Sequence, residues 1–103
     1  MRQIYESEFE KEVLEASEVV LVDFFTEWCG YCHMLTPILE KVALSLEGIK
    51  IVKIDAEKCH NLTYDYNIEF YPKMLIFKNG QLVDHIDGYV PQKVIEQKLK
   101  EYL

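Results

Sequence analysis

Hydrophobic positions along the chain follow two periods, one typical of strands and one typical of helices. Val19–Phe25 is almost continuously apolar, which is typical of a central strand buried on both faces. Residues 49–54 indicate a second buried strand. Between these two runs, apolar residues recur at the spacing of one helical face: Leu35, Ile38, Leu39, Val42, Ala43 and Leu46. Cys32 lies three residues before this stripe, so we expect it to begin the buried face, and Pro37 predicts a kink.

The remaining segments predict shorter elements. Ser7 to Glu10 match a capping box, which predicts that a helix begins there, after a weak strand around Ile4. Residues 57–66 predict a short helix that half-buries Cys59 and turns Leu62 and Tyr66 inward. Asn79-Gly80 between two apolar runs, 74–77 and 82–86, is a strong hairpin signal. Pro91 opens a last helix whose apolar positions are Val94, Ile95, Leu99 and Tyr102.

Strands and helices therefore alternate and then end in a hairpin and a helix. This order predicts an α/β fold, with a central mixed sheet of about five strands and about four helices on its two faces. The chain has 103 residues, which suits a single domain over residues 1–103.

Charge and composition narrow the possible functions. Half of the residues are hydrophobic, so we expect a packed globule, and the net charge of −7 excludes a nucleic-acid binder because phosphates would be repelled. The apolar runs are too short to cross a membrane. The first residues lack the apolar region of a secretory signal, so we expect a cytoplasmic protein.

The candidate chemistry lies in Cys29-Gly30-Tyr31-Cys32, between the central strand and the long helix. Two cysteines at this spacing can form a disulfide across one helical turn. A thiol at a helix N-terminus is stabilised as the thiolate by the helix dipole, and a thiolate with a second thiol behind it can exchange disulfides. The helical stripe predicts that Cys32 is covered and that Cys29 lies nearer solvent.

Two other readings of these cysteines are open. Cys59 and His60 could complete a zinc site with the pair, although structural zinc sites usually present a second short-spaced pair on its own turn. The sequence from Cys29 to His33 also matches the haem attachment pattern C-x-x-C-H. The alternation of strands and helices and the absence of an export signal oppose a c-type cytochrome. A binding subunit without enzymatic activity is a further alternative.

Asp23 is the one charged residue within the central apolar strand. Burying a charge without a partner costs several kcal/mol, so we expect the pKa of Asp23 to be raised. The residue pattern alone fits a hydrogen-bonded aspartate as well as a functional proton carrier. Lys53, near the end of the next strand, fits a solvated lysine.

Together these segments resemble the thioredoxin family over essentially the whole chain. The matching parts are the active-site run 21–32, the helix start 34–39, the hairpin 77–80, Tyr71-Pro72 at the place of a cis-proline, and Gly88 at the place of a groove glycine. The resemblance implies the thioredoxin fold and an enzyme that reduces protein disulfides.

The resemblance also implies a role for each matching residue. Cys29 would attack the substrate disulfide and Cys32 would resolve the mixed disulfide, while Asp23 would exchange the proton of Cys32 with Lys53 close to its carboxylate. The groove for an extended substrate segment would be formed by Trp28, Gly30, Tyr31, Tyr71, Pro72 and Gly88. No bound cofactor is implied, because the cysteine pair carries the electrons. The implied partners are a thioredoxin reductase-type flavoprotein and oxidised proteins, and we expect a monomer.

Three positions depart from the usual family pattern. Tyr31 replaces the proline that usually lies between the cysteines, which predicts a reduction potential more oxidising than the roughly −270 mV of thioredoxin. A glutaredoxin-like or oxidant-leaning exchanger is therefore an alternative function. Phe70 replaces a small residue and Lys73 replaces a threonine beside the groove, so substrate preference is expected to differ.

Overall fold

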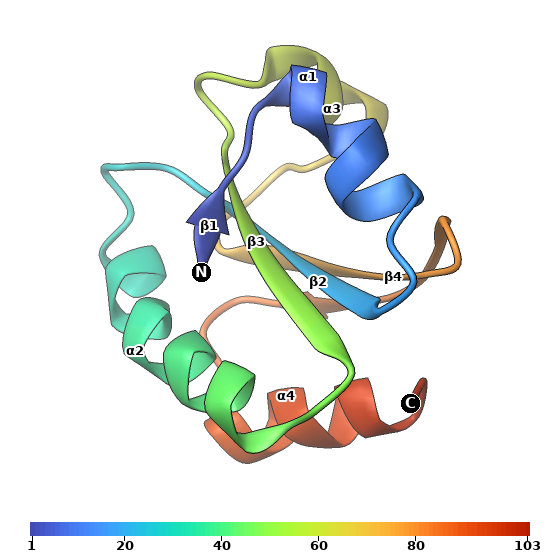
Figure 1. Ribbon diagram of the computed structural model, residues 1–103. Coiled ribbons are helices and arrows are strands. Elements are labelled where there is room, and N and C mark those ends of the chain that lie inside the picture. The colour runs from blue at the N-terminus through green and yellow to red at the C-terminus, as the bar shows by residue number, and fades with distance from the viewer.

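The computed structural model describes residues 1–103, which form a five-stranded sheet with helices on both faces (Figure 1). The strand order is β1-β3-β2-β4-β5. β1, β3 and β2 are parallel, whereas β4 and β5 are each antiparallel to the preceding strand in this order. The strands are β1 (Arg2–Gln3), β2 (Val19–Phe25), β3 (Ile49–Asp55), β4 (Lys73–Lys78) and β5 (Gln81–Asp87). The predicted α/β fold with a mixed sheet is confirmed.

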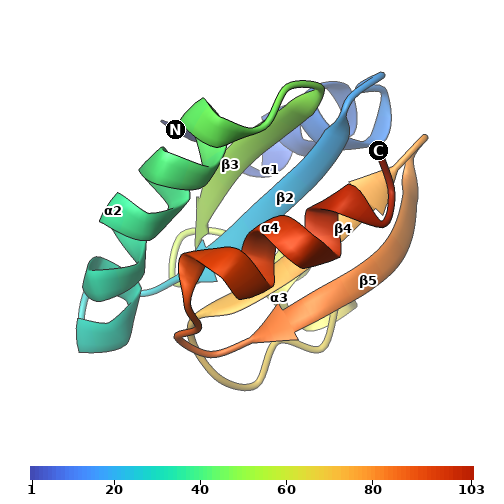
Figure 2. The ribbon, with the colours of Figure 1, turned by 90° about the horizontal axis from the view of Figure 1, so that it is seen from below.

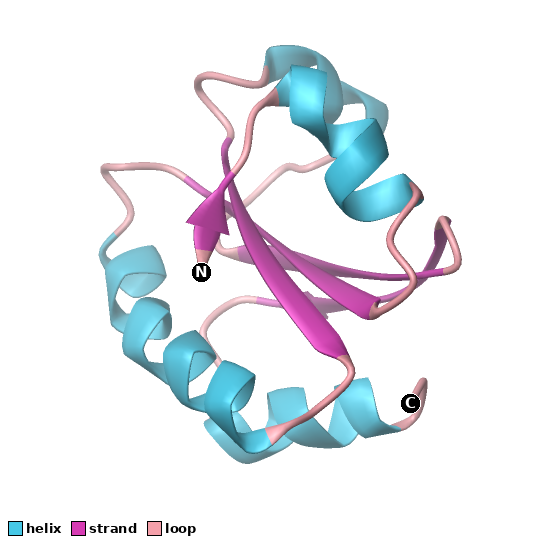
Figure 3. Ribbon diagram, in the orientation of Figure 1, coloured by secondary structure: helices cyan, strands magenta, loops and turns pink.

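The helices lie in two layers, with α1 and α3 on one face of the sheet and α2 and α4 on the other (Figure 3). Figure 2 shows the second layer from its outer side, with α2 and α4 lying over the strands. The helices are α1 (Glu6–Phe9), which continues into a π-helical segment η1 (Glu10–Leu14), α2 (Gly30–Ser45), α3 (His60–Asp65) and α4 (Gln92–Lys100). None of these helices combines the length and the apolar character that a membrane crossing requires.

Each face of the sheet has its own hydrophobic core, because side chains of a strand alternate between the two faces. β2 is buried at every residue, since it is the central strand and both helical layers cover it. The core under α1 and α3 includes Phe9, Val20, Val22, Phe24 and Phe77. The core under α2 and α4 includes Leu21, Leu35, Leu39, Ile95 and Leu99.

The first helix begins two residues earlier than the capping-box match predicts. Tyr5 is the N-cap residue of α1, and the Glu8 carboxylate accepts a 3.0 Å hydrogen bond from the Tyr5 N–H. Ile4 is fully buried and donates its N–H to the Lys53 carbonyl at 2.9 Å, so the chain stays beside β3 until just before the cap. The prediction that Ser7 caps this helix is therefore wrong.

Two predicted core positions face solvent instead. Ala43 is exposed, and Val94 is 39% exposed. α4 reaches the sheet through Ile95 and Leu99, four residues apart, and Val94 lies beside that line. α2 likewise buries a narrow line of residues spaced three or four apart, with Pro37 inside the helix: Cys32, Leu35, Leu39 and Val42.

α3 begins later than the predicted helix at 57–66, because Asp55 organises the preceding turn. The buried Asp55 carboxylate accepts a 2.9 Å hydrogen bond from the Glu57 N–H, and the Asp55 carbonyl accepts the Lys58 N–H at 3.0 Å. This arrangement is an Asx turn, which holds the backbone out of the helical conformation. Cys59, predicted to be half-buried, is completely buried before α3 begins.

The predicted hairpin is confirmed in type and position. Asn79 and Gly80 both have positive φ, 53° and 77°, as a two-residue type I′ turn requires. Gly80 also lies against η1, since a Cβ placed there would be 2.7 Å from the Leu14 carbonyl oxygen. The turn of the hairpin therefore packs against η1, in the layer that contains α1 and α3.

Candidate active site

The two cysteines of the active-site turn are joined by a disulfide at the N-terminus of α2. Cys29 is the N-cap residue, and its Cα lies 5.2 Å from that of Cys32. The Cys32 N–H donates a hydrogen bond of 3.1 Å to the Cys29 Sγ. Cys32 is only 3% exposed, whereas Cys29 is partly exposed. The predicted difference between an accessible and a covered sulfur is confirmed.

This geometry favours a negative charge on Cys29 once the disulfide is reduced. The first N–H groups of a helix have no intrahelical partner and carry partial positive charge. Here one of them, from Cys32, already points at the Cys29 sulfur. Such a donor at a helix N-terminus lowers the pKa of a thiol and makes it nucleophilic at neutral pH.

Asp23 is completely buried in β2, one residue past the middle of the strand. Side-chain alternation places it on the same face as Leu21, which is the face that α2 covers. Neither carboxylate oxygen has a hydrogen-bond partner in the protein, and burial raises the pKa of Asp23 from 3.8 to about 7. The expected rise is confirmed, so a group that can exchange a proton near neutral pH lies beneath the helix that carries the cysteines.

Lys53 lies directly opposite Asp23 in the parallel pair of β2 and β3. Its positive charge opposes the rise in the pKa of Asp23. The two side chains form no ion pair, because the Lys53 ammonium lies over the Phe25 ring at 4.6 Å from the ring centroid. Lys53 therefore acts on Asp23 through its field and not through a hydrogen bond.

A groove of about 410 Å³ near the disulfide is lined by residues from the first turn of α2 and from two loops: Tyr31, Tyr71, Pro72, Gly88 and Tyr89. The Tyr71–Pro72 peptide bond is cis, as the resemblance implies. The Gly88 N–H donates to the Pro72 carbonyl at 2.9 Å, which holds the two loops together. Four of the six residues predicted to bind substrate therefore line one groove.

Tyr89 is a groove residue that sequence reasoning missed. Its ring stacks on that of Tyr31, with centroids 5.9 Å apart and planes 27° apart. Both side chains remain exposed, at 42% and 61%. The only signal in the sequence was its position directly after Gly88.

Trp28 and Gly30 do not line this groove. Trp28 is 87% exposed and lines a larger cleft of about 740 Å³ on the side of α3, where Tyr71 also contributes. Gly30 is the exposed first residue of α2. The structure therefore divides the predicted binding surface into two hollows that share Tyr71.

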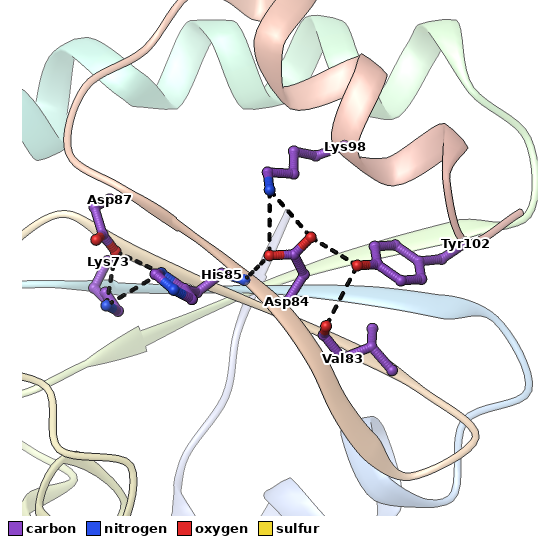
Figure 4. A network of polar contacts seen from close by, with 7 residues as sticks. All are labelled: Lys73, Val83, Asp84, His85, Asp87, Lys98 and Tyr102. Atoms are coloured by element: carbon purple, nitrogen blue, oxygen red, sulfur yellow. Dashed lines mark hydrogen bonds and ion pairs between the residues drawn. The ribbon is translucent and has the colours of Figure 1, made fainter.

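Lys73 and Asp87 form an ion pair that the sequence did not reveal, at the strand ends next to Pro72 and Gly88 (Figure 4). They face each other across β4 and β5, with the ammonium 2.7 Å from the Asp87 Oδ1. Hydrogen bonding to Lys73 lowers the pKa of Asp87. The same ammonium lies 5.1 Å from the centroid of the exposed Phe70 ring. Two positions that depart from the family pattern are thus in contact beside the groove.

The alternative readings of the cysteines do not fit this geometry. Cys59 is buried in the core under α1 and α3, whereas Cys32 belongs to α2 on the other face of the sheet. No three His, Cys, Asp or Glu side chains gather as a metal site would require. The His33 ring donates to the Glu27 carbonyl at 2.8 Å, which holds it against the active-site loop.

Comparison with known proteins identifies the family. The family model described as thioredoxin matches residues 1–101. The chain is 39% identical to thioredoxin 1 of Nostoc sp. over 102 residues, which cover 98% of this chain and 95% of that protein. It is 40% identical to thioredoxin 2 of Chlorobaculum tepidum, over 92% of this chain and 88% of the relative. It is 43% identical to the thioredoxin of Rickettsia felis, over 79% of this chain and 78% of the relative.

These matches span the fold, the cysteine pair and the loops around it. The chain therefore belongs to the thioredoxin family, and it is a thiol-disulfide oxidoreductase that reduces protein disulfides.

Proposed function

We propose that Cys29 is the attacking thiol and Cys32 the resolving thiol in the reduction of protein disulfides by this enzyme. The observation that carries this assignment is the pairing of the partly exposed Cys29 sulfur with a backbone donor at the start of α2, while Cys32 is covered. A substrate sulfur can reach Cys29 from solvent. Cys32 is only 3% exposed, so solvent offers a substrate sulfur little access to it.

The reaction begins from the reduced form of the pair. The Cys29 thiolate attacks one sulfur of the substrate disulfide, forms a mixed disulfide and releases the other substrate sulfur as a thiolate, which takes a proton from water. The Cys32 thiolate then attacks the Cys29 sulfur and releases the second substrate thiolate. Two electrons pass to the substrate, and the enzyme ends with the Cys29–Cys32 disulfide seen in the structure.

Asp23 is proposed to accept the proton of Cys32 before the second attack. Its raised pKa, about 7, suits a carboxyl group that must take and release a proton near neutral pH. Lys53 is proposed to tune this value through its charge, which favours the carboxylate form. Asp23 is buried on the sheet face that α2 covers, and Cys32 is a buried residue of α2, which makes Asp23 the candidate to serve the thiol that solvent reaches poorly.

The substrate is proposed to bind as an extended segment across the loops around Cys29. Tyr31, Tyr71, Pro72 and Gly88 line the groove on one side of Cys29, and Trp28 lines the larger cleft. Trp28 and Gly30 are the sequence neighbours of the attacking cysteine, and both are exposed, so they are proposed to contact the same segment. Exposed aromatic rings at this position provide apolar contact area for a partner segment.

The remaining assignments follow from family membership and from the surface. We infer that a thioredoxin reductase-type flavoprotein returns the oxidised enzyme to the dithiol, so that the enzyme needs no bound cofactor of its own. We further infer that residues 1–103 act as one monomeric domain in the cytoplasm. The family implies disulfide-containing proteins as substrates, and the net charge of −7 disfavours nucleic acid.

Reduction of insulin in the presence of dithiothreitol tests this proposal. The wild type is expected to accelerate precipitation of the reduced chains, and Cys29→Ser is expected to abolish the acceleration. In a separate reaction without dithiothreitol, reduced Cys32→Ser is expected to accumulate a covalent complex with insulin, because no second thiol is then present to resolve the mixed disulfide. Cys59→Ala is the matched control for loss of a cysteine elsewhere, and it is expected to retain activity.

Alkylation of the reduced enzyme provides an independent check of the two roles. At neutral pH, iodoacetamide is expected to label Cys29 much faster than Cys32, as peptide mass analysis would show. Equal labelling of the two would overturn the assignment.

A further inference from the structure

The larger hollow beside the disulfide, called the acidic cleft below, lies between the active-site loop and α3. It has a volume of about 740 Å³ and is lined in part by Trp28, Glu57, His60, Tyr64, Glu69 and Tyr71. Trp28 directly precedes Cys29, and Tyr71 directly precedes the cis-proline. Two of its lining residues are therefore the immediate sequence neighbours of the attacking cysteine and of the cis-proline.

The charged side chains of the cleft leave negative charge available to a partner. Glu57 and Glu69 are exposed, and neither forms an ion pair within the protein. Lys58 follows Glu57 in the sequence but does not pair with it either. His60 is the only lining side chain that can carry positive charge. Like charges in a concave surface focus the field and attract cations.

The aromatic side chains of the cleft are unusually open to solvent. Trp28 is 87% exposed and Tyr64 is 83% exposed. Trp and Tyr faces attract ammonium and guanidinium groups, and the aliphatic stems of Lys and Arg pack well against such rings. The combination of two free carboxylates and two open rings therefore matches a long basic side chain better than an acidic or a purely apolar one.

We propose that the acidic cleft receives a lysine or arginine side chain of the oxidised substrate, close in sequence to the cysteine that Cys29 attacks. This inference rests on the proposed function, because it assumes that Cys29 is the attacking thiol. The bonds formed and broken are those of the exchange described above. The cleft changes only the rate at which a given disulfide segment is captured, so the enzyme prefers disulfides flanked by basic residues.

Three synthetic peptides with one internal disulfide test the proposal. They differ only in the residues that flank the cysteines, which are Lys, Gln or Glu. Reduced wild-type enzyme is mixed with each peptide, the reaction is quenched with acid, and the peptide thiols are quantified by chromatography. The rate constant is expected to be about tenfold higher for the Lys peptide than for the Glu peptide, with the Gln peptide between them.

A double variant, Glu57→Gln with Glu69→Gln, is expected to lower this Lys-to-Glu ratio toward one. The matched control, Glu10→Gln with Glu18→Gln, removes the same charge from η1 and from the residue that precedes β2, and it is expected to keep the ratio. Raising the salt concentration to about 0.5 M is expected to lower the wild-type ratio, because exposed charges are screened. This last measurement needs no variant.

The outcomes distinguish failure of the cleft proposal from failure of the proposed function. Equal rates for the Lys and Glu peptides, with insulin reduction intact, would overturn the cleft proposal and leave the proposed function standing. An equal fall in the ratio for both double variants would also overturn it, since net charge alone would then explain the preference. Loss of reduction of every peptide and of insulin by the wild type would contradict the proposed function itself.

Discussion

The buried Asp23 carboxyl is expected to make the free energy of unfolding depend on pH. Its pKa is raised from 3.8 to about 7 by burial, so folding becomes less favourable as the pH rises through this window and the carboxyl must ionise inside the protein. One pKa unit corresponds to about 1.4 kcal/mol. Asp23→Asn removes the ionisation, and its stability relative to the wild type is expected to rise by roughly 2–4 kcal/mol between pH 4 and pH 8.

Urea unfolding of both proteins across this pH range measures the effect. The direction follows from the raised pKa: the cost of the buried charge is absent below about pH 4 and complete above about pH 7. Asp65→Asn, at an exposed position on α3, is the control and is expected to show little pH-dependent change. If the free energies of unfolding of Asp23→Asn and the wild type differed by the same amount at every pH, the pKa of Asp23 would not be raised by burial.

Tyr31 directly precedes Cys32, whose N–H donates to the attacking sulfur. It is the second residue of α2, where a backbone N–H has no partner within the helix. A proline there has no N–H and stiffens the turn, so Tyr31→Pro is expected to make the reduction potential more negative by about 30 mV or more, equivalent to about 1.4 kcal/mol. Tyr31→Ala keeps the N–H and is expected to stay near the wild-type value.

Redox titration of the three proteins against glutathione measures these potentials. If Tyr31→Ala moves as far as Tyr31→Pro, the aromatic ring that stacks on Tyr89 controls the potential and the backbone argument is wrong. The same titration decides whether the wild type is a reductant of the usual strength or an oxidant-leaning exchanger.

At the scale of elements, the β4–β5 hairpin depends on a glycine that also contacts η1. Gly80 has φ of 77°, and an added Cβ would lie 2.7 Å from the Leu14 carbonyl oxygen. Gly80→Ala is therefore expected to lower the free energy of unfolding by about 1–3 kcal/mol, from the strained φ and from the displaced backbone. Equilibrium unfolding in urea measures the loss.

Gly30→Ala is the matched control for this change. A Cβ at Gly30 would meet no atom within 4 Å, and the residue begins α2, where alanine is favoured over glycine. It is expected to be neutral or to stabilise by up to about 1 kcal/mol. If the two substitutions lowered the free energy of unfolding equally, neither the positive φ of Gly80 nor its contact with Leu14 would explain the effect of Gly80→Ala.

At the scale of the whole molecule, the sequence predicts what depends on local pattern. The seven-residue apolar run of β2 and the helical stripe of α2 place Cys29 at a strand–helix junction, and this alone predicts one accessible and one covered sulfur. The Asn79-Gly80 turn is likewise a local signal. These features could be read directly because residues two to four positions apart decide them.

Contacts between segments far apart in the chain could not be predicted in this way. The Lys73–Asp87 pair, the stacking of Tyr89 on Tyr31 and the acidic cleft each depend on how loops meet in space. The helix boundaries that were wrong have the same origin. Asp55 shortens α3 through its side-chain hydrogen bond, which propensity and spacing do not reveal.

Glu6 makes another contact between distant segments, because it joins α1 to the start of α3 in the same helical layer. α3 has no fully buried residue of its own, so it depends on contacts with its neighbours. The Glu6 carboxylate, on α1, accepts hydrogen bonds from the backbone N–H groups of Asn61 at 2.8 Å and Leu62 at 3.3 Å. It also accepts one from the Asn61 side chain at 3.2 Å. These donors are among the first N–H groups of α3, which lack partners within the helix.

Removing this carboxylate is expected to weaken α3 more than the rest of the molecule. Glu6→Ala leaves the N–H groups without their charged acceptor, and bonds of this kind contribute about 1.5–3 kcal/mol. We expect a comparable fall in unfolding free energy and faster amide hydrogen exchange in α3, with α2 and the central strands little changed. Glu10→Ala, an exposed position on η1, is expected to change stability by less than about 0.5 kcal/mol. Uniformly faster exchange throughout the protein would instead mean that α3 and the sheet unfold as one unit and that Glu6 stabilises both equally.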